Sequence, residues 1–139
     1  MVKTVLVAVD SSDLAWRVIA ALDQLYLDDN CVVVLAHIVP PPEPDDTVAV
    51  DVPHGEVTHL FHDREEWLDI LSEKIDYSTI PEIVTGDPAE EIVRLAGIHQ
   101  CELIVLGSRG LKGLSRIIQG SVSSEVVADA PCSVFVVKN

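Results

Sequence analysis

A segment of spaced glycines is the part of this sequence best suited to bind a ligand. It has the pattern Gly107-x2-Gly110-x9-Gly120, and it runs into the expected start of a helix at Ser121, Val122 and Ser123. Glycines let a backbone approach a phosphate closely and turn its N–H groups inward. The free N–H groups and the positive dipole end of a following helix favour an anion. The pattern therefore predicts a phosphate-binding loop, although a plain turn and a helix cap would use the same residues.

The charge around this loop differs from the charge of the whole chain. The 139 residues carry 23 acidic and 9 basic side chains, for a formal net charge of -14. Residues 103–124 contain no acid, where the average density would place about 3.6. They contain three of the basic residues, Arg109, Lys112 and Arg116. Such a segment favours an anion, or else a solvated face. The acidic remainder disfavours nucleic acids and anionic membranes as partners.

Other patterns that carry chemistry are absent or weak. The loop fits neither a Walker A motif nor the dinucleotide G-x-G-x-x-G motif, and it has no G-x-S-x-G nucleophile elbow. His54, His59 and His62 are of a type that zinc binds, but only the last two would share a helix face, so we expect a solvated surface. His37 lies in an apolar run and is expected to be a core histidine with its hydrogen bonds satisfied. The cysteines are expected to be buried free thiols: Cys31, Cys101 and Cys132.

Apolar runs and capping signals predict an alternation of strands and helices. We expect strands at residues 2–9, 31–39, 80–84, 103–106 and 133–138. Helices are expected from residue 14 to 25, from 56 to 75, from 88 onward and from 122 to 129. Residues 28–30 should close the first helical region, and the five prolines between 40 and 53 predict a surface loop. Asp87 and Pro88 form a helix start, and Pro81 suggests an edge strand.

This alternation predicts one α/β domain over residues 1–139. It should be Rossmann-like: a single open parallel five-stranded sheet with helices on both faces. The strand order 3-2-1-4-5 would bring the loops after strands one and four together at the topological switch point, where such sheets bind ligands. Those loops carry Asp10 and Gly107. No signal peptide and no apolar run of membrane-spanning length is visible, so we expect a cytoplasmic protein.

These motifs resemble those of the universal stress protein family, in its ATP-binding type. The family signature Gly-x2-Gly-x9-Gly-[Ser/Thr] is present as Gly107, Gly110, Gly120 and Ser121. Four flanking segments are similar as well: KTVLVAVDSS, VLAHIV, GDPAEEIVRLA and APCSVFVV. The resemblance covers most of the chain outside residues 40–75. It implies that the ligand is ATP, or ADP or AMP. A triphosphate approaching so acidic a chain should bring Mg²⁺ with it.

The resemblance also implies a role for individual residues. Asp10 matches an acid near the adenine and ribose, and Ile38 matches a residue that contacts the base. Leu106 and Gly107 match positions beside the ribose and phosphates. The phosphate-binding positions are Gly110, Gly120, Ser121, Val122 and Ser123. Two residues depart from the common pattern in or near these loops, Ser11 and Gln119.

The function expected from this pattern is a nucleotide-binding regulatory module of the stress response that binds nucleotide far better than it turns it over. No His or Glu lies between residues 103 and 124, so no local general base is visible. The alternative is a slow ATP hydrolase or nucleotidyl-transfer enzyme on a related fold. A phospho-acceptor receiver domain is disfavoured, because the third strand ends in Thr85 and not in an aspartate. The apolar strand 133–137 predicts an open sheet edge. The resemblance implies that two copies pair there as a homodimer.

Overall fold

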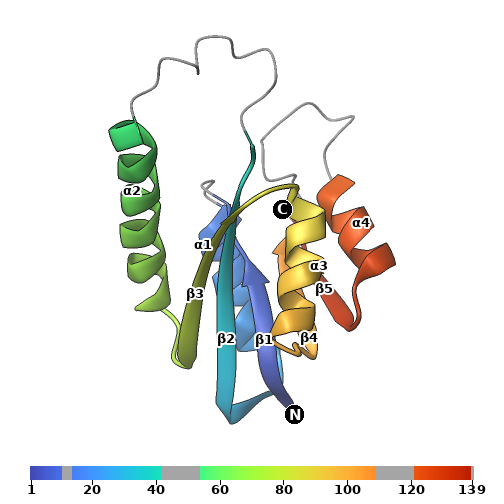
Figure 1. The fold of residues 1–139 in the computed structure, drawn as a ribbon. Helices are drawn as coiled ribbons and strands as arrows, with labels where there is room; N and C mark the ends of the chain where they lie inside the picture. The colour runs from blue at the N-terminus through green and yellow to red at the C-terminus, as the bar shows by residue number, and fades with distance from the viewer. Residues whose placement is uncertain (11–13, 42–53, 109–120, 139) are drawn as a thin grey trace.

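The protein is built around one parallel sheet of five strands in the order β3-β2-β1-β4-β5 (Figure 1). The computed structural model describes residues 1–10, 14–41, 54–108 and 121–138, with the backbone alone for residues 54–62 and 121. The strands are β1 Val2–Ala8, β2 Leu27–Val39, β3 Ser78–Thr85, β4 Leu103–Gly107 and β5 Ser133–Val137. The predicted fold class and strand order are both confirmed.

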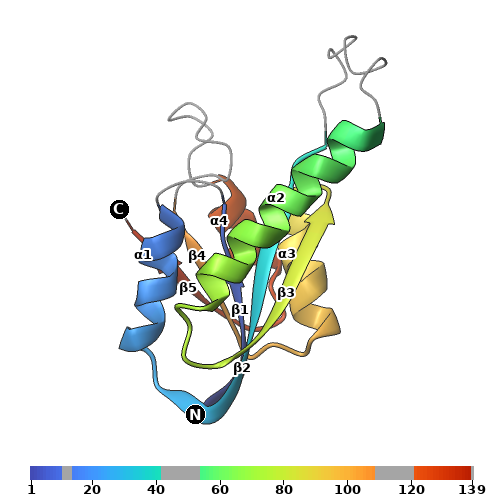
Figure 2. The ribbon, with the colours of Figure 1, turned by 90° about the vertical axis from the view of Figure 1, so that its left-hand side faces the viewer.

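Helices cover both faces of this sheet, as predicted. The helices are α1 Leu14–Ala20, the short 3-10 helix η1 Ala21–Gln24, α2 His54–Ser72, α3 Pro88–Ile98 and α4 Ser121–Asp129. In Figure 2, α2 lies in front of the sheet and α3 behind it. Side chains of α1 and α2 share one buried cluster with the sheet, and side chains of α3 and α4 share the other. None of the described helices is long and apolar enough to cross a membrane.

The alternation of side chains along the central strands explains how one sheet contributes to two hydrophobic cores. Successive side chains of a strand point to opposite faces. Thus Val5, Val7 and Val9 are buried against α1 and α2. Leu6 and Ala8 are buried against α3 and α4. The central strand is therefore apolar at nearly every position, as a strand covered on both sides must be.

The start of β2 differs from the prediction. Residues 28–30 do not close a helical region, because helical structure ends at Gln24 and β2 begins at Leu27. Leu27 is buried and pairs with Val2, and the register then shifts before Thr4 pairs with Val32. The Asp28 carboxylate accepts a hydrogen bond from the Asn30 N–H at 2.9 Å, which is typical of a local turn. The polar residues thus form an irregularity inside β2 where the sequence suggested a break.

The remaining predicted boundaries are largely confirmed. Helix α2 ends three residues early, at Ser72 and not at Ile75. Pro81 lies on β3, which is an edge strand as predicted. Asp87 caps α3 by accepting a hydrogen bond from the Glu90 N–H at 3.1 Å, and Pro88 occupies the first turn. Of the proline-rich loop, residues 42–53 lie outside the described part of the chain.

The three cysteines are free thiols, as predicted. Cys31 and Cys101 are buried and Cys132 is half-buried. Burial raises the pKa of the Cys101 thiol to about 11, and it also raises the pKa of the other two. Because the thiolate is the reactive form, these side chains act as small core residues and not as nucleophiles.

Candidate functional site at the switch point

The candidate site is a crevice that opens between the carboxyl ends of β1 and β4. The two strands pair only from Val5 with Leu103 to Val7 with Val105. Beyond that point each strand keeps its outer neighbour. The Val9 N–H donates to the Ala36 carbonyl on β2, and the Ser108 N–H donates to the Val137 carbonyl on β5, both at 2.9 Å. The central pair of strands therefore separates where the predicted ligand loops begin.

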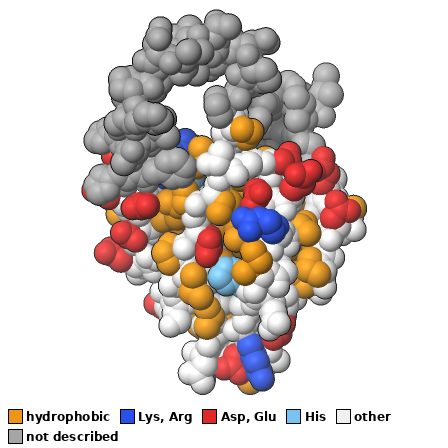
Figure 3. All heavy atoms as spheres, in the orientation of Figure 1, with side chains coloured by type: hydrophobic (Ala, Val, Ile, Leu, Met, Phe, Trp, Pro, Cys, Tyr) orange, Lys and Arg blue, Asp and Glu red, His pale blue; other side chains and the backbone are white. Residues whose placement is uncertain are grey.

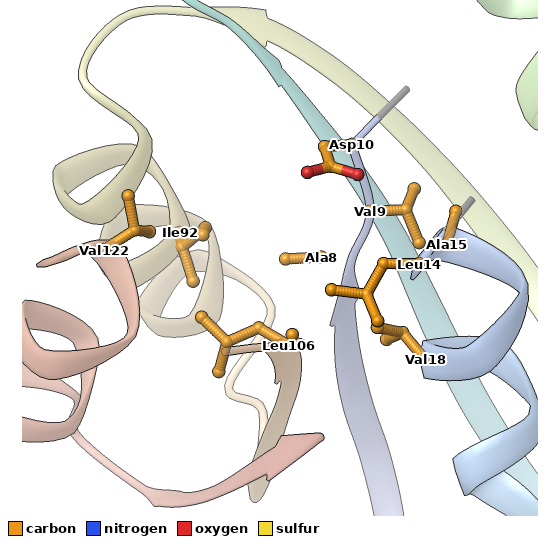
Figure 4. A pocket seen from close by; sticks show the side chains of 10 residues that line it. Ala8, Val9, Asp10, Leu14, Ala15, Val18, Ile92, Leu106 and Val122 are labelled. Carbon is orange, nitrogen blue, oxygen red and sulfur yellow. The ribbon is translucent and has the colours of Figure 1, made fainter. Parts of the chain in front are cut away.

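Four elements and the end of β1 line the cavity in this crevice (Figure 4). Its volume of about 10 Å³ is the space of roughly one water molecule. In the close view, Asp10 lies at the mouth above Ala8, with Val122 of α4 on the opposite side. The lining residues are Ala8, Val9, Asp10, Leu14, Ala15, Val18, Ile92, Leu106, Gly107 and Val122.

Most of the described residues predicted to bind nucleotide meet at this crevice. Asp10 and Leu106 are buried, with 8% and 3% of their surface exposed, and Gly107 and Val122 are half-buried. Ser123 is buried in the first turn of α4, the helix that Ser121 begins. Ile38 is not among the lining residues, because it is packed in the core beneath α3 and α4. The positions Gly110 and Gly120 lie outside the described part of the chain.

Gly107 is a glycine because Leu14 occupies the space beside it. A Cβ atom at position 107 would lie 2.5 Å from Leu14 Cδ2 and 3.1 Å from Leu14 Cγ. Leu14 is the first residue of α1, and Figure 4 shows its side chain directed toward the cavity. The sequence placed Leu14 only on the apolar stripe of a helix, so its contact with the glycine loop was not predicted. The strand order brings the loops after β1 and β4 together, and a glycine at the end of β4 with a leucine just after the β1 loop could have suggested this contact.

His37 of β2 is a buried polar residue directly behind this crevice. Only 2% of its surface is exposed, and its Nδ1 atom lies 2.9 Å from the carbonyl oxygen of Val9. Its Nε2 atom contacts the guanidinium of Arg64 on α2. The Trp67 ring packs against it in a T-shaped arrangement, with ring centroids 5.2 Å apart. The prediction of a satisfied core histidine is confirmed, but its two partners were not predicted.

The environment keeps the His37 ring neutral. Burial lowers its pKa below the usual 6.5, and the Arg64 charge lowers it further, against the Val9 hydrogen bond and the Asp10 charge. Among the described residues, no group of three His, Cys, Asp or Glu side chains could hold a metal ion. The side chains of His54, His59 and His62 lie outside that description.

The fold and the crevice define an open parallel α/β protein with a candidate ligand site at its topological switch point. The model of the universal stress protein family matches residues 1–138, and the chain belongs to this family. A universal stress protein of Thermus aquaticus is 32% identical over 142 residues, covering 99% of this chain and all of that protein.

Several solved structures share the fold. Protein MJ0577 of Methanocaldococcus jannaschii superposes with a TM-score of 0.82 at 24% identity, over 99% of this chain and 96% of that one. A universal stress protein in complex with cAMP has a TM-score of 0.65 at 21% identity, covering 99% and 97% of the two chains. An Arabidopsis thaliana family protein with AMP bound has a TM-score of 0.63 at 22% identity, covering 99% and 91%.

Proposed function

We propose that this protein is a nucleotide-binding module of the stress response, and that ATP, or ADP or AMP, binds at the crevice between β1 and β4. The observation that carries the proposal is the separation of these strands, which gathers Asp10, Gly107 and the first turn of α4 at one rim. Two structures of the same fold hold adenine nucleotides, cAMP and AMP. Together with family membership, they support an adenine nucleotide as the ligand.

The chemistry of the rim suits the two ends of such a ligand. The Asp10 carboxylate can accept hydrogen bonds from ribose hydroxyls or an adenine amine. Helix α4 has nine residues, and its N-terminal N–H groups favour a phosphate. In this proposal Leu106 and Gly107 lie beside the ribose and phosphates, and Ile38 contacts the base. The phosphates are bound by Gly110, Gly120, Ser121, Val122 and Ser123.

The narrowness of the cavity bears on where the ligand lies. A space for about one water cannot hold an adenine ring. In this proposal the nucleotide therefore rests at the mouth, between Asp10 and the start of α4, with Leu14 as the floor. A Cβ at position 107 would force the Leu14 side chain, which lines the cavity, to move. Gly107→Ala should accordingly weaken nucleotide binding while changing no polar group.

In this proposal Mg²⁺ arrives bound to the phosphates of ATP, and the protein needs no separate metal site. Asp10 is the one acid among the described residues that line the cavity. Mg²⁺ needs no more than one or two carboxylates when phosphates and waters complete its shell. We expect ATP to bind more weakly to this acidic protein when the metal is chelated, since the phosphate charge is then uncompensated. Equal affinity with and without chelator would contradict this expectation.

The proposed site is tested by calorimetry with ATP on matched glycine variants. Gly110→Val should block approach of the backbone and weaken binding by about 1.5–3 kcal/mol, the worth of a hydrogen bond to a charged group. Gly97→Ala is the control, because a Cβ there meets nothing within 4 Å. Nucleotide released from the purified, denatured protein would identify the natural ligand. Unchanged affinity in Gly110→Val, or no nucleotide binding at all, would overturn the proposal.

We propose binding and not rapid turnover. The rim offers backbone N–H groups and serine hydroxyls, which stabilise bound phosphates in the ground state and the transition state alike. Of the described lining residues, only Asp10 could act as a base, and it is assigned to the ribose end. A single-turnover assay with excess protein tests this. Turnover near 1–10³ per second, roughly the ordinary enzyme range, and lost in Asp10→Ala, would favour the alternative of a hydrolase or nucleotidyl transferase.

We further propose a cytoplasmic homodimer that pairs through β5. This strand lies at the end of the sheet, and its central residues are half-buried and apolar. The Val137 carbonyl faces β4, so by alternation the Val136 N–H faces the open edge. Val136→Pro should remove that donor and weaken the dimer. Light scattering at micromolar concentration measures the mass, and a monomeric wild-type protein would contradict the proposal.

A further inference from the structure

We infer that His37 and Arg64 are positioning residues for Asp10, and that they couple helix α2 to the base and ribose end of the nucleotide site. This inference rests on the proposed function. The residues that carry it come from three separate elements: the end of β1, the carboxyl end of β2 and the inner side of α2. Neither His37 nor Arg64 lines the cavity itself.

The first step is the hydrogen bond between His37 and Val9. The Val9 carbonyl belongs to the peptide group that joins Val9 to Asp10. A carbonyl can only accept, so Nδ1 of His37 carries the proton and donates it over 2.9 Å. The Val9 N–H in turn donates to Ala36 on the same strand β2. Both polar groups of Val9 are thus fixed, and with them the plane from which Asp10 leaves the sheet.

The second step is the contact between His37 and α2. A guanidinium can only donate, so Nε2 of His37 accepts from Arg64 and bears no proton. Trp67 lies one turn further along α2, and its ring meets the imidazole in a T-shaped arrangement. The ring is therefore held from two sides by one helix, in a single orientation and a single tautomer. A shift of α2 along the sheet would move the ring, and the ring would move the Val9 carbonyl.

The third step concerns the charge around the ring. From α2 it faces the Arg64 cation, from the end of β1 it faces Asp10, and from β3 its register partner is the uncharged Ile83. A second proton would place an N–H group on Nε2 directly against the guanidinium. The hydrogen bond from Arg64 therefore exists only while His37 is neutral. Burial favours that state by lowering the pKa of the ring.

A comparison of two ligands tests the coupling. ATP uses both ends of the proposed site, whereas inorganic triphosphate can use only the phosphate end. We expect His37→Leu and Arg64→Met to weaken ATP about fivefold to tenfold, in line with the loss of one hydrogen bond. Triphosphate affinity should be unchanged. His37→Asn should retain most of the ATP affinity, because its amide can replace Nδ1–H as donor to Val9. Arg94→Met is the control, since the partner of Arg94 among the described residues is Glu91, three positions away on the same helix α3.

A double-mutant cycle and a pH profile separate positioning from general stability. The Arg64→Met effect on ATP should vanish in an Asp10→Asn background, because Asp10 is the residue being positioned. Wild-type affinity should fall as the pH drops toward 5, and His37→Asn should lack that fall. The ionisation of ATP is common to both proteins and cancels in the comparison.

Three outcomes would overturn the inference: equal loss of ATP and triphosphate affinity, additive effects of Arg64→Met and Asp10→Asn, or matching pH profiles for wild type and His37→Asn. Arg64→Met and His37→Asn keep the test decisive even if His37→Leu does not fold. Chemical unfolding of each variant establishes whether it is folded. A failure of the proposed function looks different. In that case wild-type protein binds neither ATP nor triphosphate, which overturns both proposals.

Discussion

Adjacent residues of β2 point to opposite faces of the sheet, and they meet different chemistry there. Ile38 points into the core beneath α3 and α4, which it shares with the apolar side chains of Ile92 and Leu106. His37 points toward α2, where it meets the Arg64 guanidinium. An apolar face packs well but leaves backbone direction free at strand ends. A polar contact supplies direction, because a hydrogen bond has geometry and a methyl contact has little.

The two faces of the sheet also contribute different residues to the candidate site. The α3 and α4 face supplies Ile92, Leu106 and Val122 to the lining of the cavity. The α1 and α2 face supplies Leu14 beside Gly107 and the His37 contact behind Asp10. Substitution of Ile104, which does not line the cavity, should therefore change stability alone. Substitution of Leu14 or His37 should change stability and the site together.

The largest effect is expected from the apolar face. Ile104→Ala removes a side chain with no exposed surface, and the cavity left behind should lower the free energy of unfolding by about 2–5 kcal/mol. Ile98→Ala on α3 is the control, since that side chain is 60% exposed and its loss should cost far less. Urea unfolding measures both variants. Equal losses would show that this face is not the tightly packed one.

A smaller effect is expected from the polar contact. His37→Leu leaves the Val9 carbonyl without its donor, and an unsatisfied buried group costs about 1–3 kcal/mol. His37→Asn should recover part of this loss by donating to the same carbonyl. Urea unfolding at neutral pH compares the two. If Leu is as stable as the wild-type histidine, the hydrogen bond contributes nothing and the contrast between the faces is lost.

The same residue gives stability a dependence on pH. His37 has its ordinary pKa of about 6.5 in the unfolded chain and a lower pKa when folded. Below 6.5 the unfolded chain binds a proton that the folded protein does not. Its free energy of unfolding should therefore fall as the pH falls, by up to about 1.4 kcal/mol per pH unit, until the folded pKa is reached. The contribution is fully present above pH 6.5. His37→Asn should remove this slope, which a series of urea titrations would reveal.

The smallest effect is expected from a polar contact that is local to one helix. Asp87→Ala removes the cap of α3, and such losses cost about 1 kcal/mol. Asp87→Asn should be nearly neutral, because asparagine caps a helix equally well. Thermal unfolding ranks the pair. A cost for Asp87→Ala as large as that of Ile104→Ala would mean that capping, and not packing, dominates this face.

Local signals in the sequence predicted the framework well. The apolar runs located all five strands, Pro81 marked an edge, and Asp87 with Pro88 marked the start of α3. Alternation with hydrophobic strands was enough to predict a parallel sheet with two covered faces. These features succeed because each depends on residues close together in the chain, as a cap or a period does.

What the sequence did not predict depends on contacts across long separations. Nothing near Arg64 indicates that its side chain turns inward to a histidine 27 positions earlier. Leu14 beside Gly107 joins opposite halves of the chain in the same way. The early start of β2 was missed because the polar residues 28–30 resemble a break, whereas the buried Leu27 that begins the strand gives only one apolar residue as a signal.

The pairing of β1 with β4 has a consequence during synthesis of the chain. A ribosome makes β1 first, but the partner that covers one side of it follows only when residues 103–107 emerge. Until then, the backbone N–H and C=O groups along that edge of β1 are open to any other extended segment, including a second nascent copy. Chains that terminate between β3 and β4, or that are translated slowly there, should therefore be especially prone to aggregation. Pairing with β4 closes that edge from Val5 to Val7, and the crevice opens beyond these paired residues.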